Sequence, residues 1–195
     1  MLRYENGWFI ENVPVDQIAE KFGTPCYIYS TAEIDAAVTK VMEALEGLPA
    51  TVFFACKANG NPLLLNHLHQ KGLWMDVVTM GEYQVALRSG VKPEHIAVNG
   101  NGKTLPDIEK WLNDGVFAIN IDSKEEYGLI VENGLSGENG THFFLRVNPD
   151  VDGKTHPYIS TGLKKNKFGI PLEEAQKITP HQYLPEPVLR HIAKR

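Results

Sequence analysis

The feature that most constrains the fold of this sequence is a regular alternation of short apolar runs with longer amphipathic segments from Thr51 onward. The apolar runs favour strands, and the segments between them have the apolar spacing of helices. In chain order the pairs are 51–57 with 63–70, 75–79 with 81–88, 96–99 with 106–113, 117–121 with 124–132, and 142–147 with a helix that Pro171 opens. This alternation predicts five strands in a parallel sheet covered by helices.

Residues that favour helix ends support these boundaries. Ser123 precedes Lys124 and two glutamates, which is typical of an N-cap followed by an acidic first turn. Glycine follows four of the helical stretches, where a residue with positive φ commonly closes a helix. These glycines are Gly72, Gly90, Gly115 and Gly134.

Composition argues against several classes of protein. The 195 residues are 43% hydrophobic and 22% charged, as in an ordinary globular domain. A net charge of -5 argues against nucleic-acid binding, which needs a concentrated basic face, and the cluster Lys164, Lys165 and Lys167 is typical of a solvated loop. Cys26 and Cys56 form no disulfide framework, and no stretch approaches the roughly 20 apolar residues of a membrane span. We therefore expect a cytoplasmic protein that is neither secreted nor inserted in a membrane.

Lys57 is the first candidate site residue, because it ends the first apolar strand. If the alternating residues Phe53 and Ala55 face the inside of a barrel, Lys57 does too, at the C-terminal mouth where barrel active sites lie. A partly desolvated amine there would be available for Schiff-base formation. Taken alone, a lysine at a strand end is more often a solvated charge.

Asp76 and Arg146 are the other two candidates. Asp76 stands at the head of the second strand, and Arg146 lies within the fifth. Each would be costly to bury without a partner, and barrel catalytic residues come from the ends of several strands. The pattern alone supports a shared site and separate surface charges about equally.

Three other segments carry weaker signals. The run Gly100–Thr104 is not a phosphate-binding P-loop, because the position five residues before Gly102 is Ala97. It is either a turn or a loop that offers backbone N–H groups to an anion. His67 and His69 are two apart on a predicted helix, so we expect no metal site there. The long connection 150–167 is either a lid or an ordinary excursion.

Several segments together resemble the fold-type III pyridoxal-phosphate (PLP) decarboxylases. They are FGTPCYIY at 22–29, ACKAN at 55–59, Asp76–Val78 with Gly81 and Glu82, LRVNP at 145–149, and KFGI at 167–170. The stretch 155–162 is more similar to the diaminopimelate decarboxylases than to the ornithine or arginine enzymes. The resemblance extends from about residue 7 to residue 174.

The resemblance implies an α/β fold that is part of a (β/α)8 barrel of the alanine-racemase/decarboxylase type. Residues 31–178 would form the partial PLP-binding barrel, residues 1–30 would be strands of the family's β-domain, and residues 179–195 a divergent tail. We therefore expect the segment 7–29 to stay out of the barrel sheet. Since a complete barrel has eight strands, the chain is expected to be an N-terminal, truncated portion.

The resemblance also implies a function and its residues. Lys57 would be the catalytic lysine that carries PLP, Asp76 and Arg146 would bind the cofactor with Lys57, and no metal is expected. The reaction would be decarboxylation of meso-2,6-diaminopimelate to L-lysine, on a small amino-acid substrate, by a family that forms homodimers. Because the family's phosphate loop and ring-stacking histidine are not found, we expect weak PLP attachment and no useful turnover by this chain alone. The alternatives are a non-catalytic PLP-binding module, an inactive fragment of a related amino-acid decarboxylase, and a flavodoxin-like doubly wound domain, which strand order distinguishes.

Overall fold

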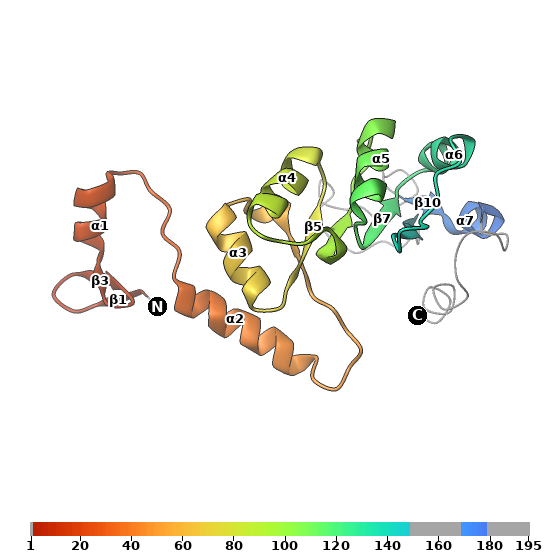
Figure 1. Cartoon of the computed structure of the whole chain (residues 1–195). Coiled ribbons are helices and arrows are strands. Elements are labelled where there is room, and N and C mark those ends of the chain that lie inside the picture. The colour runs from red at the N-terminus through yellow and green to blue at the C-terminus, as the bar shows by residue number, and fades with distance from the viewer. Residues whose placement is uncertain (1, 149–168, 179–195) are drawn as a thin grey trace. The chain divides into compact units, whose positions relative to one another are not determined.

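The computed structural model describes residues 2–148 and 169–178 (Figure 1). The chain divides into two compact units, residues 1–51 and residues 52–195. The connection 150–167 with the cluster Lys164, Lys165 and Lys167, the stretch 155–162 and the tail 179–195 lie outside the described residues.

The first unit contains a small antiparallel sheet and two helices. Its elements are β1 (Leu2–Tyr4), β2 (Trp8–Ile10), β3 (Val13–Pro14), α1 (Val15–Phe22) and α2 (Thr31–Ala44). The strand β2 pairs with β1 on one side and β3 on the other, and with no strand of the parallel sheet. This confirms that Trp8–Ile10 stays out of the parallel sheet. The assignment of residues 1–30 to a β-domain stays a prediction.

The second unit contains a five-stranded parallel sheet. Its strands are β4 (Phe53–Ala55), β5 (Trp74–Val77), β6 (Ile96–Val98), β7 (Ala118–Ile121) and β8 (His142–Leu145). They are hydrogen-bonded in the order β4-β5-β6-β7-β8, and every pair is parallel. A doubly wound domain reverses its strand order, so the flavodoxin-like alternative is wrong. The sheet runs in the order of a barrel, and the described strands do not close into one.

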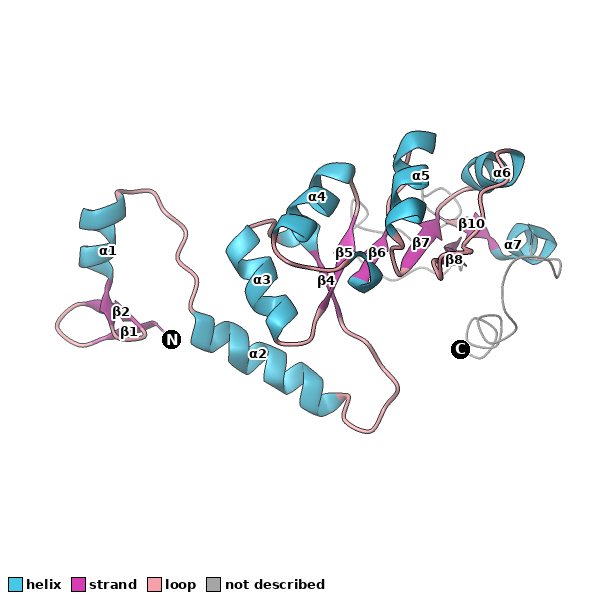
Figure 2. Cartoon of the chain, viewed as in Figure 1, coloured by secondary structure: helices cyan, strands magenta, loops and turns pink. Residues whose placement is uncertain are grey.

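Helices connect these strands (Figure 2). They are α3 (Pro62–Gln70), α4 (Met80–Arg88), α5 (Leu105–Asp114) and α6 (Lys124–Glu132), with short 3-10 turns η1 (Cys56–Ala58) and η2 (Pro93–His95). The predicted bounds of α6 are confirmed, and Ser123 caps it by accepting a hydrogen bond from the Glu126 N–H. The four glycines expected after helices all have positive φ.

A second, two-stranded parallel sheet was not predicted. It pairs β9 (Val147–Asn148) with β10 (Ile170–Pro171), and α7 (Leu172–Ile178) follows directly. The expectation that Pro171 opens the helix is therefore wrong by one residue. Pro171 lies in the strand, where its missing N–H is tolerated because β10 is a two-residue element at a sheet edge.

One face of the five-stranded sheet is buried beneath helices. Its strand residues are at most 2% exposed: Met75, Val77, Ile96, Val98, Ile119 and Ile121. The register places Met75 beside Ile96 and Val98 beside Ile119, so they share one face. Helices α3 and α4 contact β5, and α6 contacts β7. This layer is the core of the second unit.

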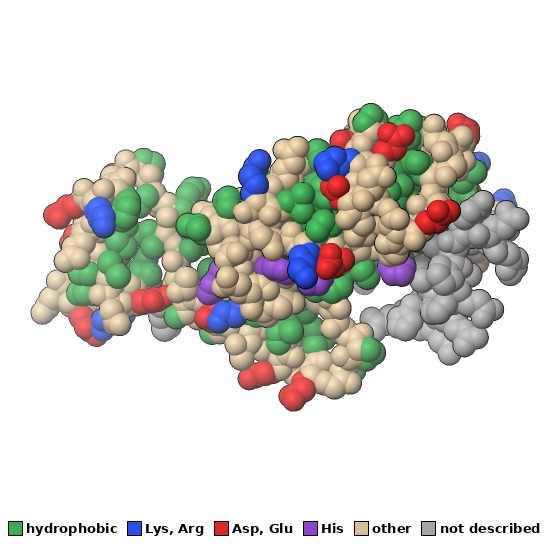
Figure 3. Space-filling view, in the orientation of Figure 1, with side chains coloured by type: hydrophobic (Ala, Val, Ile, Leu, Met, Phe, Trp, Pro, Cys, Tyr) green, Lys and Arg blue, Asp and Glu red, His purple; other side chains and the backbone are tan. Residues whose placement is uncertain are grey.

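The other face of the sheet is only half-buried. Phe53 and Trp74 are partners in register, and their rings meet edge to face at 5.4 Å. Trp74 also stacks on His95 at 4.5 Å, and Figure 3 shows histidine side chains in a row across the surface. Two residues further along each strand the same face carries Ala55 and Asp76. Aromatic rings thus occupy the amino ends of these strands, and polar groups begin toward their carboxyl ends.

Candidate functional site

Lys57 lies in the turn η1, immediately after β4. The strand ends at Ala55, and the Asn59 N–H closes the turn by donating to the Cys56 carbonyl at 3.1 Å. The expectation that Lys57 continues the alternation of Phe53 and Ala55 is therefore wrong, because a 3-10 turn does not preserve the two-residue period. The residue is exposed at the carboxyl edge of the sheet, where its amine is accessible to a ligand.

Asp76 is the third of four residues in β5, inside the strand and not at its head. It is half-buried and lies in register with Ala55 on one side and Ala97 on the other. Burial raises the pKa of its carboxyl group above the ordinary value. The positive charges of Lys57 and Arg146 oppose that rise, and the Glu82 charge adds to it. The charges of the other two predicted residues, Lys57 and Arg146, therefore both act on Asp76.

Asn99 is a partner of Asp76 that the sequence analysis missed. Its Nδ2 donates to Asp76 Oδ1 at 2.5 Å, and its backbone N–H donates to the Val77 carbonyl at 2.8 Å. The sequence did contain a signal, because Asn99 follows Ala97 by two residues and so continues the same face of the sheet. The hydrogen bond lowers the Asp76 pKa and fixes the carboxylate.

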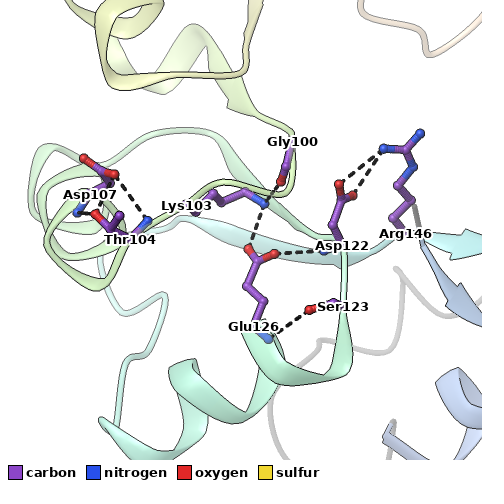
Figure 4. Close-up of polar contacts among 8 residues, drawn as sticks. All are labelled: Gly100, Lys103, Thr104, Asp107, Asp122, Ser123, Glu126 and Arg146. Atoms are coloured by element: carbon purple, nitrogen blue, oxygen red, sulfur yellow. Dashed lines mark hydrogen bonds and ion pairs between the residues drawn. The ribbon is translucent and has the colours of Figure 1, made fainter. Parts of the chain in front are cut away.

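Arg146 lies between β8 and β9, at a break in what the sequence predicted as one strand. Its backbone N–H donates to the Ile121 carbonyl at 2.9 Å, and its own carbonyl accepts from the Ile170 N–H at 2.7 Å. Its Nη1 lies 3.3 Å and 3.4 Å from the two carboxylate oxygens of Asp122 (Figure 4). The guanidinium is thus tied to the loop that follows β7.

The loop Gly100–Thr104 is held by contacts of its own. The Lys103 ammonium binds the Gly100 carbonyl and pairs with Glu126 at 2.7 Å, and its side chain is 0% exposed. Thr104 forms a capping box with Asp107 at the start of α5. The described contacts favour a structural role for this loop.

The candidate site is therefore an amine after β4, a carboxylate near the carboxyl end of β5 and a guanidinium after β8, all in one parallel sheet. The accessible Lys57 amine can attach a carbonyl compound covalently, and the partly buried Asp76 can stabilise positive charge or hold a proton. Among residues 2–148 and 169–178 there is no group of three histidine, cysteine or acidic side chains arranged to hold a metal ion. In the same ranges no helix is long and apolar enough to span a membrane.

Comparison with known proteins identifies the family. The model of the pyridoxal-dependent decarboxylases, pyridoxal binding domain, matches residues 31–183. This chain belongs to that family. The expected fold, a portion of an α/β barrel, agrees with its solved relatives.

Relatives at the sequence level are diaminopimelate decarboxylases. That of Pseudomonas aeruginosa is 45% identical over 172 residues, which are 87% of this chain and 41% of the relative. That of Aquifex aeolicus is 40% identical over 179 residues, 90% of this chain and 42% of the relative. The diaminopimelate decarboxylase of M. jannaschii in complex with L-lysine matches with a TM-score of 0.76 and 37% identity, over 91% of this chain and 43% of the other. The chain thus spans about two fifths of the length of these relatives.

Proposed function

We propose that this chain supplies the cofactor-attachment part of a PLP-dependent decarboxylase that converts meso-2,6-diaminopimelate to L-lysine. The observation that carries the proposal is that Lys57, Asp76 and Arg146 lie at or near the carboxyl ends of strands of one parallel sheet, with Asp76 half-buried. Carboxyl edges of this kind are where barrel enzymes place their active sites. The relatives carry the name of this activity, and two of their structures contain L-lysine.

The three residues fit PLP in chemical terms. Lys57 provides an accessible primary amine for covalent attachment, and among the described residues it is the lysine whose charge acts on Asp76. Asp76, held by Asn99, provides a carboxylate on which the Lys57 charge acts, and Arg146 provides a second positive charge that acts on it. When bound, PLP supplies an electron sink for the loss of CO2.

Each residue then has a definite task at the site. Lys57 Nζ would hold the cofactor covalently, as an accessible primary amine can. Asp76 accepts the Asn99 hydrogen bond at Oδ1, which leaves Oδ2 to orient or protonate a group on the ligand. Arg146 keeps positive charge beside this carboxylate. The homodimer and the cytoplasmic location implied by the family resemblance belong to the same proposal.

A second candidate is a PLP-binding module without turnover. It is favoured by the half-buried face of the five-stranded sheet, which the described strands do not close into a barrel. Loops after the seventh and eighth strands usually hold the phosphate in such barrels. In both candidates Lys57 attaches PLP. Only the first candidate also decarboxylates a substrate.

One experiment tests the attachment site and separates the candidates. PLP is added to the 195-residue wild type, to Lys57→Ala and to the surface control Lys92→Ala, whose side chain is 67% exposed. Absorbance of bound PLP, the lysine trapped by borohydride, and lysine release from diaminopimelate are recorded. We expect weak trapping at Lys57 that is lost only in Lys57→Ala, and no useful turnover. Trapping spread over surface lysines would contradict the role of Lys57, and robust turnover would exclude the second candidate.

A further inference from the structure

A continuous set of polar contacts runs from the loop after β6 to Arg146 (Figure 4). Asp122 is at its centre, in the turn between β7 and α6. Its side chain is 1% exposed, whereas that of Arg146 is 41% exposed. The buried partner is therefore the carboxylate, and the accessible end of the pair is the guanidinium.

The backbone of Asp122 is fixed at both of its polar groups. Its N–H donates to Glu126 Oε2 at 3.1 Å, and its carbonyl accepts from the Gly169 N–H at 3.1 Å. The neighbouring Ile121 carbonyl accepts from the Arg146 N–H at 2.9 Å. The carboxylate of Asp122 therefore projects from a turn with little freedom to move.

Glu126 is fixed in turn by Lys103. Their ion pair is 2.7 Å long, and the two side chains are only 0% and 10% exposed. Screening by solvent is weak at such a place, so the pair holds its geometry far better than a surface ion pair does. The Glu126 N–H also donates a hydrogen bond to the Ser123 hydroxyl oxygen at 3.1 Å. The start of α6 is thus clamped to the loop after β6.

We infer that Asp122 is a positioning residue for the cofactor site, which fixes the Arg146 guanidinium at the carboxyl end of β8, and that the Lys103–Glu126 pair fixes Asp122. This rests on the proposed function, since it assigns a purpose to Arg146 at that site. A free arginine side chain samples many rotamers, and an ion pair to a fixed, buried carboxylate removes most of them. Arg146 is thereby presented to the site in a defined position, with its exposed part available to a ligand.

The first test follows Arg146 without any cofactor. The full chain is treated with phenylglyoxal, and modification of Arg146 is measured by peptide mass spectrometry in the wild type, Asp122→Asn and the control Asp107→Asn. Asp107 lies in the capping box of α5, so its variant loses a helix cap and keeps the contacts to Arg146. We expect several-fold faster modification in Asp122→Asn only, because a released guanidinium is more accessible. Equal rates in all three proteins would overturn the inference.

The second test places the effect at the PLP site. Borohydride trapping at Lys57 is titrated with PLP in the wild type, Asp122→Asn, Arg146→Met and the double variant. We expect each single variant to need about tenfold more PLP, since a hydrogen bond to a charged group is lost. Asp122→Asn should cause no further change in the Arg146→Met background. An equal effect in both backgrounds would overturn the inference, because Asp122 would then not act through Arg146.

The two tests separate the inference from the proposed function. If the wild type is not trapped at Lys57, the proposed function fails, while the phenylglyoxal rates still decide whether Asp122 holds Arg146. If trapping occurs at Lys57 and Arg146→Met does not weaken it, the proposed function stands and the inference fails. Urea denaturation of every variant checks folding, and Asp122→Ser, which keeps a polar atom at this position, replaces Asp122→Asn if that variant unfolds.

Discussion

Asn99 donates a hydrogen bond to Asp76 across neighbouring strands, with 2.5 Å between Nδ2 and Oδ1. The bond links Asp76, the one ionisable residue of β5, to the loop that follows β6. Burial raises the Asp76 pKa above its ordinary value, and this bond opposes that rise.

Replacing Asp76 by Asn is expected to stabilise the chain at neutral pH. The Asp76 pKa is higher in the folded chain than its ordinary value of 3.8. Between pH 3.8 and the folded-state pKa, the folded state therefore binds more protons than the unfolded state. The free energy of unfolding therefore falls as the pH rises through the folded-state pKa, and the loss persists at pH 7. Asp76→Asn avoids that loss and keeps an oxygen that accepts from Asn99.

Urea denaturation at pH 7 and at pH 3 measures this effect. Asp76→Asn should be more stable than the wild type at pH 7, and the difference should vanish at pH 3, where the wild-type carboxyl group is protonated in both states. The exposed Asp16→Asn serves as the control and should show no such gain. A difference that is the same at both pH values would contradict the raised pKa of Asp76.

Replacing Gly100 by Ala is expected to destabilise the second unit by about 1–3 kcal/mol. Gly100 has a φ of +92°, and an added Cβ would lie 2.6 Å from Val78 Cγ1. Gly102 provides a matched control in the same loop, because a Cβ there meets nothing within 4 Å. Gly102→Ala should change stability by less than about 0.5 kcal/mol in the same urea titration. Equal effects of the two variants would refute the close approach of Gly100 to Val78.

Replacing Tyr83 by Phe is expected to cost about 1–2 kcal/mol of stability. Tyr83 is 0% exposed, and its hydroxyl donates to Asp114 Oδ2 at 2.7 Å, which joins α4 to the end of α5. Loss of the hydroxyl leaves Asp114 with Lys110 as its remaining partner at 2.7 Å. Tyr27→Phe, at a side chain that is 92% exposed, should have no effect. Thermal denaturation of both variants is the measurement, and PLP trapping at Lys57 should stay unchanged.

The two cysteines are expected to react at very different rates. Cys56 is 2% exposed, and its burial, with the charges of Glu82 and Asp76, raises the thiol pKa to about 12. Cys26 is exposed. At pH 8 a thiol reagent should modify Cys26 quickly and Cys56 only after unfolding, because the thiolate is the reactive form. Counting modified thiols by mass spectrometry with and without urea checks this, and rapid modification of Cys56 in the folded chain would contradict its burial.

Local signals in the sequence determined the order and kind of the five strands β4 to β8 and of the helices α3 to α6 in the second unit. Ser123 and the glutamates after it predicted the start of α6, and Gly134 predicted its end, because capping and positive φ depend on residues close in the chain. The alternation of apolar runs and helices predicted a parallel sheet. Lys57, Asp76 and Arg146 could be chosen because charges beside apolar strands are unusual.

Only the tertiary structure decided how those charges are arranged. It placed Lys57 in a turn after β4 and Arg146 at a break after β8. A strand ends where its hydrogen bonds to the neighbouring strands stop, even where the apolar pattern of the sequence continues. The structure alone revealed Asn99 and Asp122 as partners. Each lies more than 20 residues away in the sequence from the side chain that it holds, so no local pattern connects them. Pairing between distant strands depends on sheet register, and register follows from packing of the whole unit, which no local pattern contains.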